Sequence, residues 1–212
     1  MKRGAGERVH IYLYDKDQIG KSEDAIRNCS IEYIKDMQME IPAHALESAR
    51  IFRSPAGKPF FIDLSEIHFS VSHSGSVWGC AIDDAPIGFD LEDMYRIKRN
   101  SAQAPEMDID ERWQKIARRF FSPEEYEFVR RGGKKAFFRL WVRKEAYVKY
   151  KGLKLIQEIS NVNMVAGEDL ISELPDAYVE EINLGQKLIG AYCAAEKKKI
   201  RGIKDHRKTS DF

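Results

Sequence analysis

The 212-residue sequence lacks the features of a secreted or membrane-spanning protein. It has only three cysteines, Cys29, Cys80 and Cys193, and no C-x-x-C pair, which argues against a disulfide framework and a cysteine metal site. Its apolar stretches are short, as in residues 188–195, whereas about 20 residues are needed to cross a bilayer. The basic start of the chain leads into no apolar signal segment. We therefore expect a cytoplasmic protein that makes no use of a membrane.

The chain also lacks an excess of charge of either sign, because it has 35 Lys and Arg residues and 34 Asp and Glu residues. Residues 197–212 nevertheless hold seven basic and two acidic residues, which leaves 28 basic against 32 acidic residues in the rest of the chain. We predict that this basic tail is solvated and poorly ordered. The alternative is contact with nucleic acid or with an acidic partner.

The spacing of apolar residues predicts an alternation of helical and β-rich segments. A helix is expected from Ser22, its possible N-cap, and Pro42 marks a break or a new helix start. Further helices are expected over 110–120, from Pro123 to Gly132-Gly133, and over 134–150. The expected strands cover residues 9–14, 60–62, 67–72, 77–82, 87–92, 159–165, 177–182 and 187–195.

The two halves of the chain resemble one another, since each runs from a helix into a β-meander. We therefore predict an α+β fold of two similar lobes with a site between them. The expected boundaries are an N-terminal lobe at 1–95, a linker or mobile loop at 96–110, a C-terminal lobe at 111–196 and the basic tail at 197–212.

Two acidic residues share one face of the strand Ile87–Glu92. The strand period of two places Gly88, Asp90 and Glu92 on the face opposite Ile87, Phe89 and Leu91. Neighbouring carboxylates repel, so they need a cation, hydrogen-bond donors or open water to stay ionised together. A solvated outer face is the simpler interpretation. Gly88 leaves room for a ligand or another backbone to come close.

A helical stripe supplies a third carboxylate. Trp141, Glu145 and Lys149 lie at positions i, i+4 and i+8 of one helix. They are either a core Trp beside an ordinary Glu–Lys pair, or a third oxygen ligand with a phosphate partner. Three carboxylates without clustered Cys or His suit Mg²⁺ bound together with substrate phosphates.

A third polar segment is Ser70-Val71-Ser72-His73-Ser74-Gly75. Its hydroxyls, imidazole and backbone N–H groups could hold a phosphate, or the segment could be an ordinary turn.

Five segments in this order resemble the motifs of the 4′-phosphopantetheinyl transferases of the surfactin-synthetase-activating type. They cover roughly residues 57–153, and no single one is specific by itself. They are Gly57-Lys58-Pro59, Phe69-Ser70-Val71-Ser72-His73-Ser74, Ile87-Gly88-Phe89-Asp90-Leu91-Glu92, Phe120-Phe121-Ser122-Pro123-Glu124-Glu125-Tyr126 and Trp141-Val142-Arg143-Lys144-Glu145-Ala146-Tyr147-Val148-Lys149.

The resemblance implies a monomer of two similar α+β lobes, related by a pseudo-two-fold axis, with coenzyme A and Mg²⁺, or Mn²⁺, in the cleft between them. Asp90, Glu92 and Glu145 would hold the metal, and Lys149 would touch the pyrophosphate. The adenosine and 3′-phosphate end of coenzyme A would lie against Lys58, Pro59, Ser72 and His73.

The implied reaction moves 4′-phosphopantetheine from coenzyme A to a serine of an apo acyl or peptidyl carrier protein and releases 3′,5′-ADP. A base must take the serine proton. Glu145 is the first choice, acting directly or through a water, although a ligand role would lower its basicity. Glu125 is the second choice, but it also occupies the third helical position of a capping box at Ser122.

The N-terminal region departs from the family pattern. Members of this type usually carry a longer basic segment that contacts the 3′-phosphate, and here Ser22–Arg27 resembles only its end. Arg27 is the best candidate for that contact. Other basic residues that could replace it are Lys16, Lys21, Arg50 and Arg53.

Two other functions stay open. The same carboxylates could serve a different Mg²⁺-dependent phosphate enzyme, such as a hydrolase or nuclease. The basic residues 130–135 and the tail could instead make the chain a non-catalytic binding module, or steer an acidic carrier protein.

Overall fold

The computed structural model describes residues 8–95 and 109–208, and its elements are mixed helices and strands. The first half contains β1 (Arg8–Asp15), a 3-10 turn (Lys16–Gln18), α1 (Ser22–Met37), α2 (Ala43–Ser48), β2 (Ile51–Arg53), β3 (Pro59–Phe61), β4 (His68–Ser74), β5 (Val77–Asp83) and β6 (Gly88–Asp93). The second half contains α3 (Ile109–Phe120), α4 (Pro123–Lys151), α5 (Leu155–Glu158), β7 (Val165–Ala166), β8 (Asp169–Leu170), β9 (Glu173–Leu174), β10 (Ala177–Asn183), β11 (Leu188–Ala194) and β12 (Lys199–Asp205). The predicted α+β class is confirmed.

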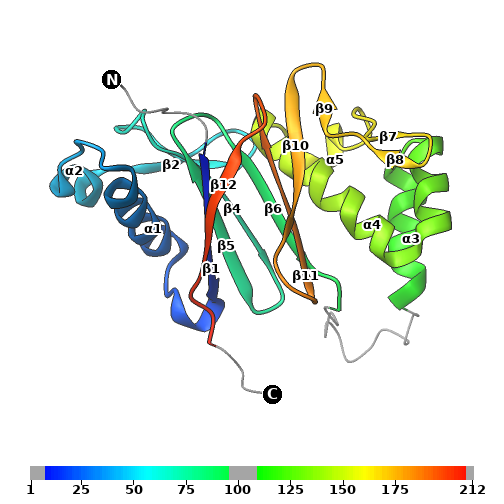
Figure 1. Cartoon of the computed structure of the whole chain (residues 1–212), viewed down its shortest axis with the longest axis horizontal. Helices are drawn as coiled ribbons and strands as arrows, with labels where there is room; N and C mark the ends of the chain where they lie inside the picture. The colour runs from blue at the N-terminus through cyan, green and yellow to red at the C-terminus, as the bar shows by residue number, and fades with distance from the viewer. Residues whose placement is uncertain (1–7, 96–108, 209–212) are drawn as a thin grey trace.

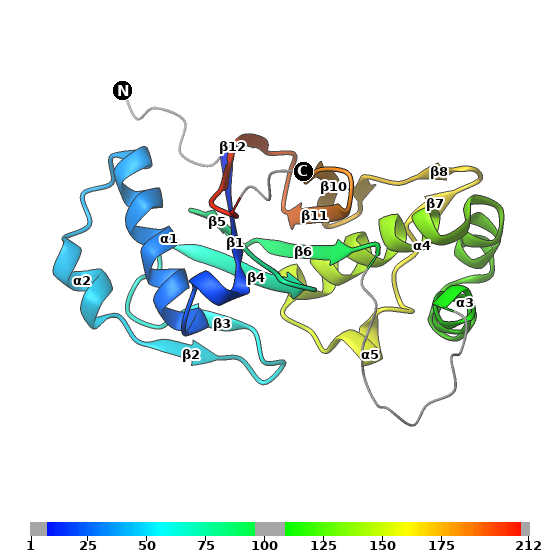
Figure 2. The ribbon, with the colours of Figure 1, turned by 90° about the horizontal axis from the view of Figure 1, so that it is seen from below.

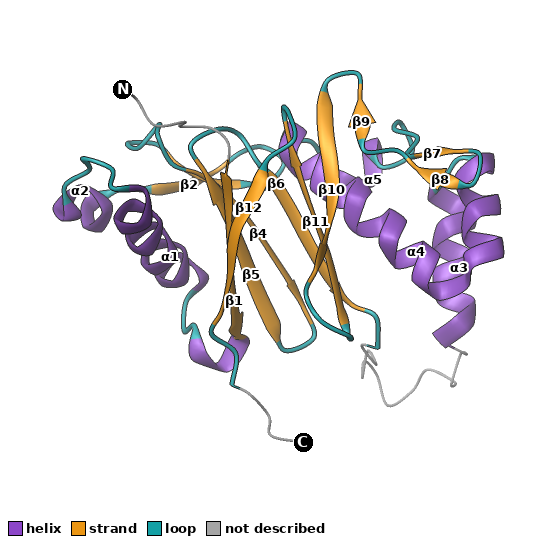
Figure 3. Ribbon diagram, viewed as in Figure 1, coloured by secondary structure: helices purple, strands orange, loops and turns teal. Residues whose placement is uncertain are grey.

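Two four-stranded sheets form the centre of the molecule. Their strand orders are β12-β1-β5-β4 and β6-β11-β10-β9. Figures 1 and 3 show β1, β4, β5, β6, β11 and β12 in the middle with α1 and α2 on one side and α3 and α4 on the other, and Figure 2 shows the same order from below. Apolar side chains of β1, such as Ile11, pack against Phe89 and Leu91 of β6 and Tyr192 of β11 in the core between the sheets.

Helices cover the outer faces of both sheets. On α1, Ile26, Cys29 and Tyr33 follow the helical period and are buried with Trp78 and Cys80 of β5. On the other side, Phe137 and Leu140 of α4 share a core with Ala191 of β11. Ser22 is the first helical residue rather than the N-cap, which is Lys21. Its hydroxyl accepts a hydrogen bond from Trp78 Nε1 at 3.1 Å instead.

Helix α4 consists of two helical segments joined at Gly133, whose φ of 66° and ψ of −156° are not helical. The predicted helix end at Gly132-Gly133 is therefore confirmed. The predicted capping box is present as well, because Ser122 Oγ accepts from the Glu125 amide and the Glu125 carboxylate accepts from the Ser122 amide. Pro42 is the N-cap of α2, which confirms a new helix start.

The predicted lobe boundaries are wrong at two strands. Strand β6 was assigned to the lobe 1–95 but pairs with β11, with Asp90 opposite Ala191. The tail 197–212 was expected to be disordered, yet β12 pairs in parallel with β1. Pairing with β1 satisfies the β12 backbone groups, which a solvated tail would leave to water. Residues 96–108 of the expected linker lie outside the described residues, and α3 begins at 109.

Ion pairs explain why the basic tail is held. Lys204 Nζ lies 2.6 Å from Asp36 and 3.1 Å from Glu32 on α1. Lys198 Nζ lies 3.1 Å from Asp83 at the end of β5, and both side chains are almost fully buried. The charge count of the sequence could not show these partners, because they lie more than 100 residues away along the chain.

One predicted strand is mostly absent. Residues 159–165 were expected to form a strand, but only Val165 belongs to one, the two-residue β7. The preceding residues are held by Lys144, whose ammonium donates to the carbonyls of Ile159 and Val162. In the described ranges, no helix is long and apolar enough to cross a membrane.

The buried Asp83 predicts a pH dependence of stability. Burial and the neighbouring Asp84 raise the pKa of Asp83 from 3.8 to about 7, although Lys198 opposes the shift. Between about pH 4 and pH 7 the folded chain therefore keeps a proton that the unfolded chain has released, so this group's contribution to the free energy of unfolding falls as pH rises.

We expect the free energy of unfolding of the wild type, minus that of Asp83→Asn, to decrease from about pH 4 to about pH 7 and to level off above pH 8. Urea unfolding at a series of pH values measures this difference. A difference that is constant over that range contradicts the assignment.

Candidate functional site

Helix α4 passes directly over the start of β6. A Cβ atom added to Gly88 would lie 1.9 Å from the Ala146 carbonyl oxygen and 2.5 Å from the Tyr150 nitrogen. No side chain fits at that distance, so the glycine permits the crossing. The expectation of a close approach at Gly88 is confirmed, and the approaching group is the backbone of α4.

The crossing brings three carboxylates together. Asp90 and Glu92 project from one face of β6, while Phe89 and Leu91 project into the core between the sheets. Glu145 of α4 completes the group, and one ligand atom from each of the three residues lies within 4.8 Å of the others. Asp90 is buried, and Glu92 and Glu145 are half-buried. The sequence-predicted cluster is therefore assembled by the fold.

Lys149 is the cation beside these carboxylates. Its ammonium lies 2.7 Å from Asp90 Oδ1 and 3.7 Å from Glu145 Oε2. Burial opposes its charge, but Asp90 and Glu145 together raise the pKa of Lys149. Burial and the nearby Asp90 raise the pKa of Glu145 well above its ordinary value, against the effect of Lys149. Among the described residues, the Lys149 ammonium therefore pairs with two of the three carboxyl groups, Asp90 and Glu145.

The donor set fits a hard divalent cation. Asp90 Oδ1 accepts hydrogen bonds from Lys149 Nζ and from Ser72 Oγ at 2.6 Å. The other oxygen, Oδ2, is buried, and within the described part of the chain no group donates a hydrogen bond to it. A buried carboxylate oxygen in that position is costly unless a cation binds it. Carboxylate oxygens are the ligands that Mg²⁺ and Mn²⁺ prefer.

Strand β4 borders this cluster through a row of serines. Ser70, Ser72 and Ser74 alternate along β4, and each hydroxyl bonds to a residue of β6. Ser72 contacts Asp90, and Ser74 Oγ contacts Glu92 Oε2. Ser74 belongs to the polar segment 70–75 that could hold a phosphate, but its contact with a carboxylate was not predicted. The sequence could have indicated this position, because three serines spaced two apart on a strand share one face.

The predicted coenzyme A residues lie at different distances from this cluster. Lys58 Nζ donates to the Ile87 carbonyl at 2.7 Å, directly before β6. Burial, with the charge of Lys149, lowers the pKa of Lys58 to about 8. Pro59 is buried at the start of β3. His73 is exposed, and the strand period places it on the face of β4 opposite Ser72.

Arg27 and Glu125 are engaged elsewhere. Arg27 Nη1 donates to the Leu46 carbonyl of α2 at 2.5 Å. Glu125 is completely buried, and its oxygens accept from the Ser122 and Met164 amides. Lys144 Nζ lies 2.8 Å from Glu125 Oε2. These contacts give Glu125 a structural position in the cap of α4, outside the three-carboxylate cluster.

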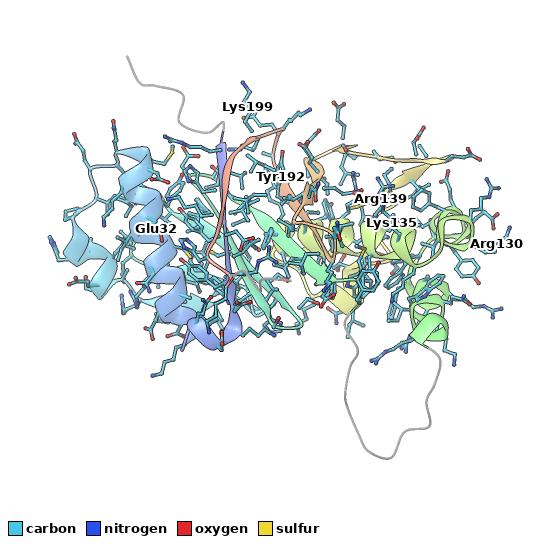
Figure 4. All side chains as sticks on the ribbon, turned by 60° about the horizontal axis from the view of Figure 1, so that its bottom comes forward. Glu32, Arg130, Lys135, Arg139, Tyr192 and Lys199 are labelled. Atoms are coloured by element: carbon cyan, nitrogen blue, oxygen red, sulfur yellow. The ribbon has the colours of Figure 1, made fainter. Side chains whose placement is uncertain are left out.

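The basic residues 130–135 lie on the helical side of the molecule, where Figure 4 labels Arg130 and Lys135. Arg130 and Arg131 both pair with Glu127, and Arg131 also pairs with Glu168. Lys134 Nζ lies 5.5 Å from the ring centroid of Tyr95. The positive charge of this patch is therefore partly compensated within the chain.

Comparison with known proteins identifies the relatives of this chain. The family model of the 4′-phosphopantetheinyl transferase superfamily matches residues 86–206, more than half of the sequence. The 4′-phosphopantetheinyl transferase Sfp of Bacillus subtilis (strain 168) is 34% identical over 151 residues, which are 66% of this chain and 60% of that protein. The 4′-phosphopantetheinyl transferase psf-1 of Bacillus pumilus is 33% identical over 172 residues, which are 79% of this chain and 64% of that protein. The chain thus spans less than two thirds of the length of these relatives.

The close contact at Gly88 can be tested by stability and metal binding, without a substrate. Gly88→Ala places a methyl group against the α4 backbone, so β6 and α4 must separate, at a cost of about 1–3 kcal/mol or more in the free energy of unfolding. Because Asp90 and Glu92 move away from Glu145, Mn²⁺ binding should weaken.

The matched control is Gly202→Ala on β12, because a Cβ atom there meets nothing within 4 Å. Thermal unfolding and Mn²⁺ titration are measured for both variants. If Gly88→Ala behaves like Gly202→Ala in both measurements, the crossing does not hold the cluster together.

Proposed function

Because this chain belongs to the 4′-phosphopantetheinyl transferase superfamily, we propose that it transfers the 4′-phosphopantetheine group of coenzyme A to a serine of an apo acyl or peptidyl carrier protein and releases 3′,5′-ADP. The observation that carries the proposal is the cluster of Asp90, Glu92 and Glu145 beside Lys149. A carboxylate cluster with an ammonium suits a reaction between phosphates and a hydroxyl, in which charge must be neutralised at the phosphorus.

Asp90, Glu92 and Glu145 are the proposed ligands of Mg²⁺, with Mn²⁺ as a substitute. The buried oxygen Oδ2 of Asp90 and the gathering of three carboxyl groups within 4.8 Å of one another support this assignment. When bound, such a cation neutralises pyrophosphate charge and so favours departure of the nucleotide.

The chain's own residues supply the remaining chemistry. The serine oxygen forms a bond to the β-phosphorus, and the bond from that phosphorus to the 3′,5′-ADP oxygen breaks. Lys149 offsets charge on the pyrophosphate oxygens. Glu145 is the proposed base that takes the serine proton, because its carboxylate lies in the cluster within 3.7 Å of the Lys149 ammonium. Glu125 is less suitable, because it is fully buried and bound within the helix cap.

Coenzyme A is proposed to lie across the β3–β4 side of the cluster. Lys58 directly precedes β3, which begins at Pro59, and Ser72 Oγ donates to Asp90 Oδ1. His73 is exposed on the face of β4 opposite Ser72, and we propose that it meets the adenosine or 3′-phosphate end. Arg27 stays a candidate for the 3′-phosphate, although its guanidinium is held by α2.

We also propose that two similar lobes are related by pseudo-two-fold symmetry. The order of elements supports it, since β1, α1, β4 and β5 correspond to β6, α4, β10 and β11. In each set the last strand pairs with the first, giving β1-β5-β4 and β6-β11-β10. A monomeric state and a cytoplasmic location stay predictions.

The direct test is a transfer assay with coenzyme A, Mg²⁺ and a panel of apo carrier proteins, read by mass spectrometry. Asp90→Ala and Glu145→Ala should each lower the transfer rate by about 100-fold or more, and chelation of the metal should stop the wild type. Glu196→Ala, at an exposed residue, is the control and should keep full activity.

Retained transfer in Asp90→Ala or Glu145→Ala removes that residue from the proposed set. If all carriers stay unmodified and the chain binds no coenzyme A, the proposed function fails. Metal-dependent release of phosphate or nucleotide without a carrier would instead indicate a hydrolase.

A second assay addresses the carrier. Lys134 and Lys135 are proposed to steer an acidic carrier protein, because the neighbouring arginines are already paired with glutamates. Lys134→Glu with Lys135→Glu should raise the KM for the carrier several-fold at low salt and leave the KM for coenzyme A unchanged. Equal changes in both constants, or none, would contradict a steering role.

A further inference from the structure

Strands β4 and β6 lie next to each other in different sheets, and serine side chains join them. The bonded residues advance together along both strands. Ser70 contacts Phe89, and Ser74 contacts Asp93. Ser72 and Ser74 reach Asp90 and Glu92, each 18 residues further along the chain. The row of hydroxyls therefore runs in register with the row of carboxylates.

Ser70 and Ser74 have the same structural role in this contact. Their exposed fractions are 1% and 0%. Each hydroxyl oxygen accepts a backbone N–H from β6 at 3.0 Å, from Phe89 for Ser70 and from Asp93 for Ser74. Removing either hydroxyl leaves one buried amide of β6 without this partner, so both substitutions should reduce stability to a similar extent.

The two serines differ in where the hydroxyl proton goes. Ser70 Oγ is 3.5 Å from the Phe89 carbonyl oxygen, a long contact to the backbone. Ser74 Oγ makes a short contact with Glu92 Oε2. An ionised carboxylate only accepts, and the Ser74 oxygen already accepts from Asp93, so Ser74 donates its proton to Glu92.

We propose that Ser74 is a positioning residue, which fixes the carboxylate of Glu92 for metal binding by donating a hydrogen bond to Oε2. The inference rests on the proposed role of Glu92 as a metal ligand. A glutamate has three side-chain torsions, and a charge-assisted hydrogen bond restricts them before the metal arrives. Ser72 makes the corresponding contact to Asp90, so both strand carboxylates are held from β4.

The experiment compares Ser74→Ala with Ser70→Ala in the full chain. Mn²⁺ affinity is measured by electron paramagnetic resonance with coenzyme A present, and thermal unfolding is measured without metal. Both variants should lose similar thermal stability. Ser74→Ala should bind Mn²⁺ about 10- to 100-fold more weakly than the wild type, whereas Ser70→Ala should stay within about twofold.

The activity assay gives a second readout. The Mg²⁺ concentration for half-maximal transfer should rise in Ser74→Ala, and kcat at saturating Mg²⁺ should recover. Ser70→Ala, which should lose a similar amount of stability, should not show this rise in the Mg²⁺ requirement, so the comparison separates a metal defect from a structural one. Ser74→Cys keeps most of the side-chain volume but donates only weakly, so it should reproduce the metal defect if Ser74→Ala does not fold.

Equal Mn²⁺ affinity in the Ser74 and Ser70 variants overturns the positioning role while leaving the proposed function intact. Wild-type Mn²⁺ affinity in Ser74→Cys would also overturn the positioning role. Failure of the wild type to bind Mn²⁺ overturns the metal assignment itself, and the positioning role with it.

Discussion

The contact between helix α4 and strand β6 determines where the functional groups of this protein lie. At Gly88 the two backbones are too close for any side chain. Because of this crossing, Glu145 and Lys149 of the helix meet Asp90 and Glu92 of the strand. A tryptophan, phenylalanine and leucine core under α4 holds the helix against its sheet. The site thus depends on packing that involves none of its own charged groups.

The three carboxylates of the cluster repel one another, and the folded structure holds them together despite this repulsion. Three carboxylates lie close together in a partly buried place, with Lys149 beside Asp90 and Glu145, and burial raises the pKa of Glu145. Such a cluster contributes little to stability by itself, because desolvation offsets the attraction between charges. The serine hydroxyls of β4 and the ammonium of Lys149 reduce the repulsion. The proposed metal binding would explain why the carboxylates lie together despite their repulsion.

Each half of the chain contributes one strand to a sheet of the other half. Strand β6 leaves the first half to pair with β11, and β12 returns from the C-terminal end to pair with β1. The buried pair Lys198–Asp83 and the contacts of Lys204 with α1 fix that return. The halves consequently cannot separate without breaking a sheet, and the cluster sits between elements that both halves supply.

Local patterns in the sequence determined the fold class, the capping box at Ser122, the helix end at Gly133 and the pairing of Asp90 with Glu92 on one strand face, because each depends on residues only a few positions apart. The helical spacing offered Glu145 and Lys149 as a ligand and a phosphate partner, and the motif resemblance favoured that interpretation. Only the tertiary structure decided that β6 joins the second sheet, that the basic tail is a strand, and that Glu125 is buried against Lys144 and Met164, away from the cluster. It also decided that Ser74 reaches Glu92. These outcomes depend on partners far apart in the chain, and neither charge counts nor periodicity contains the distance between such partners.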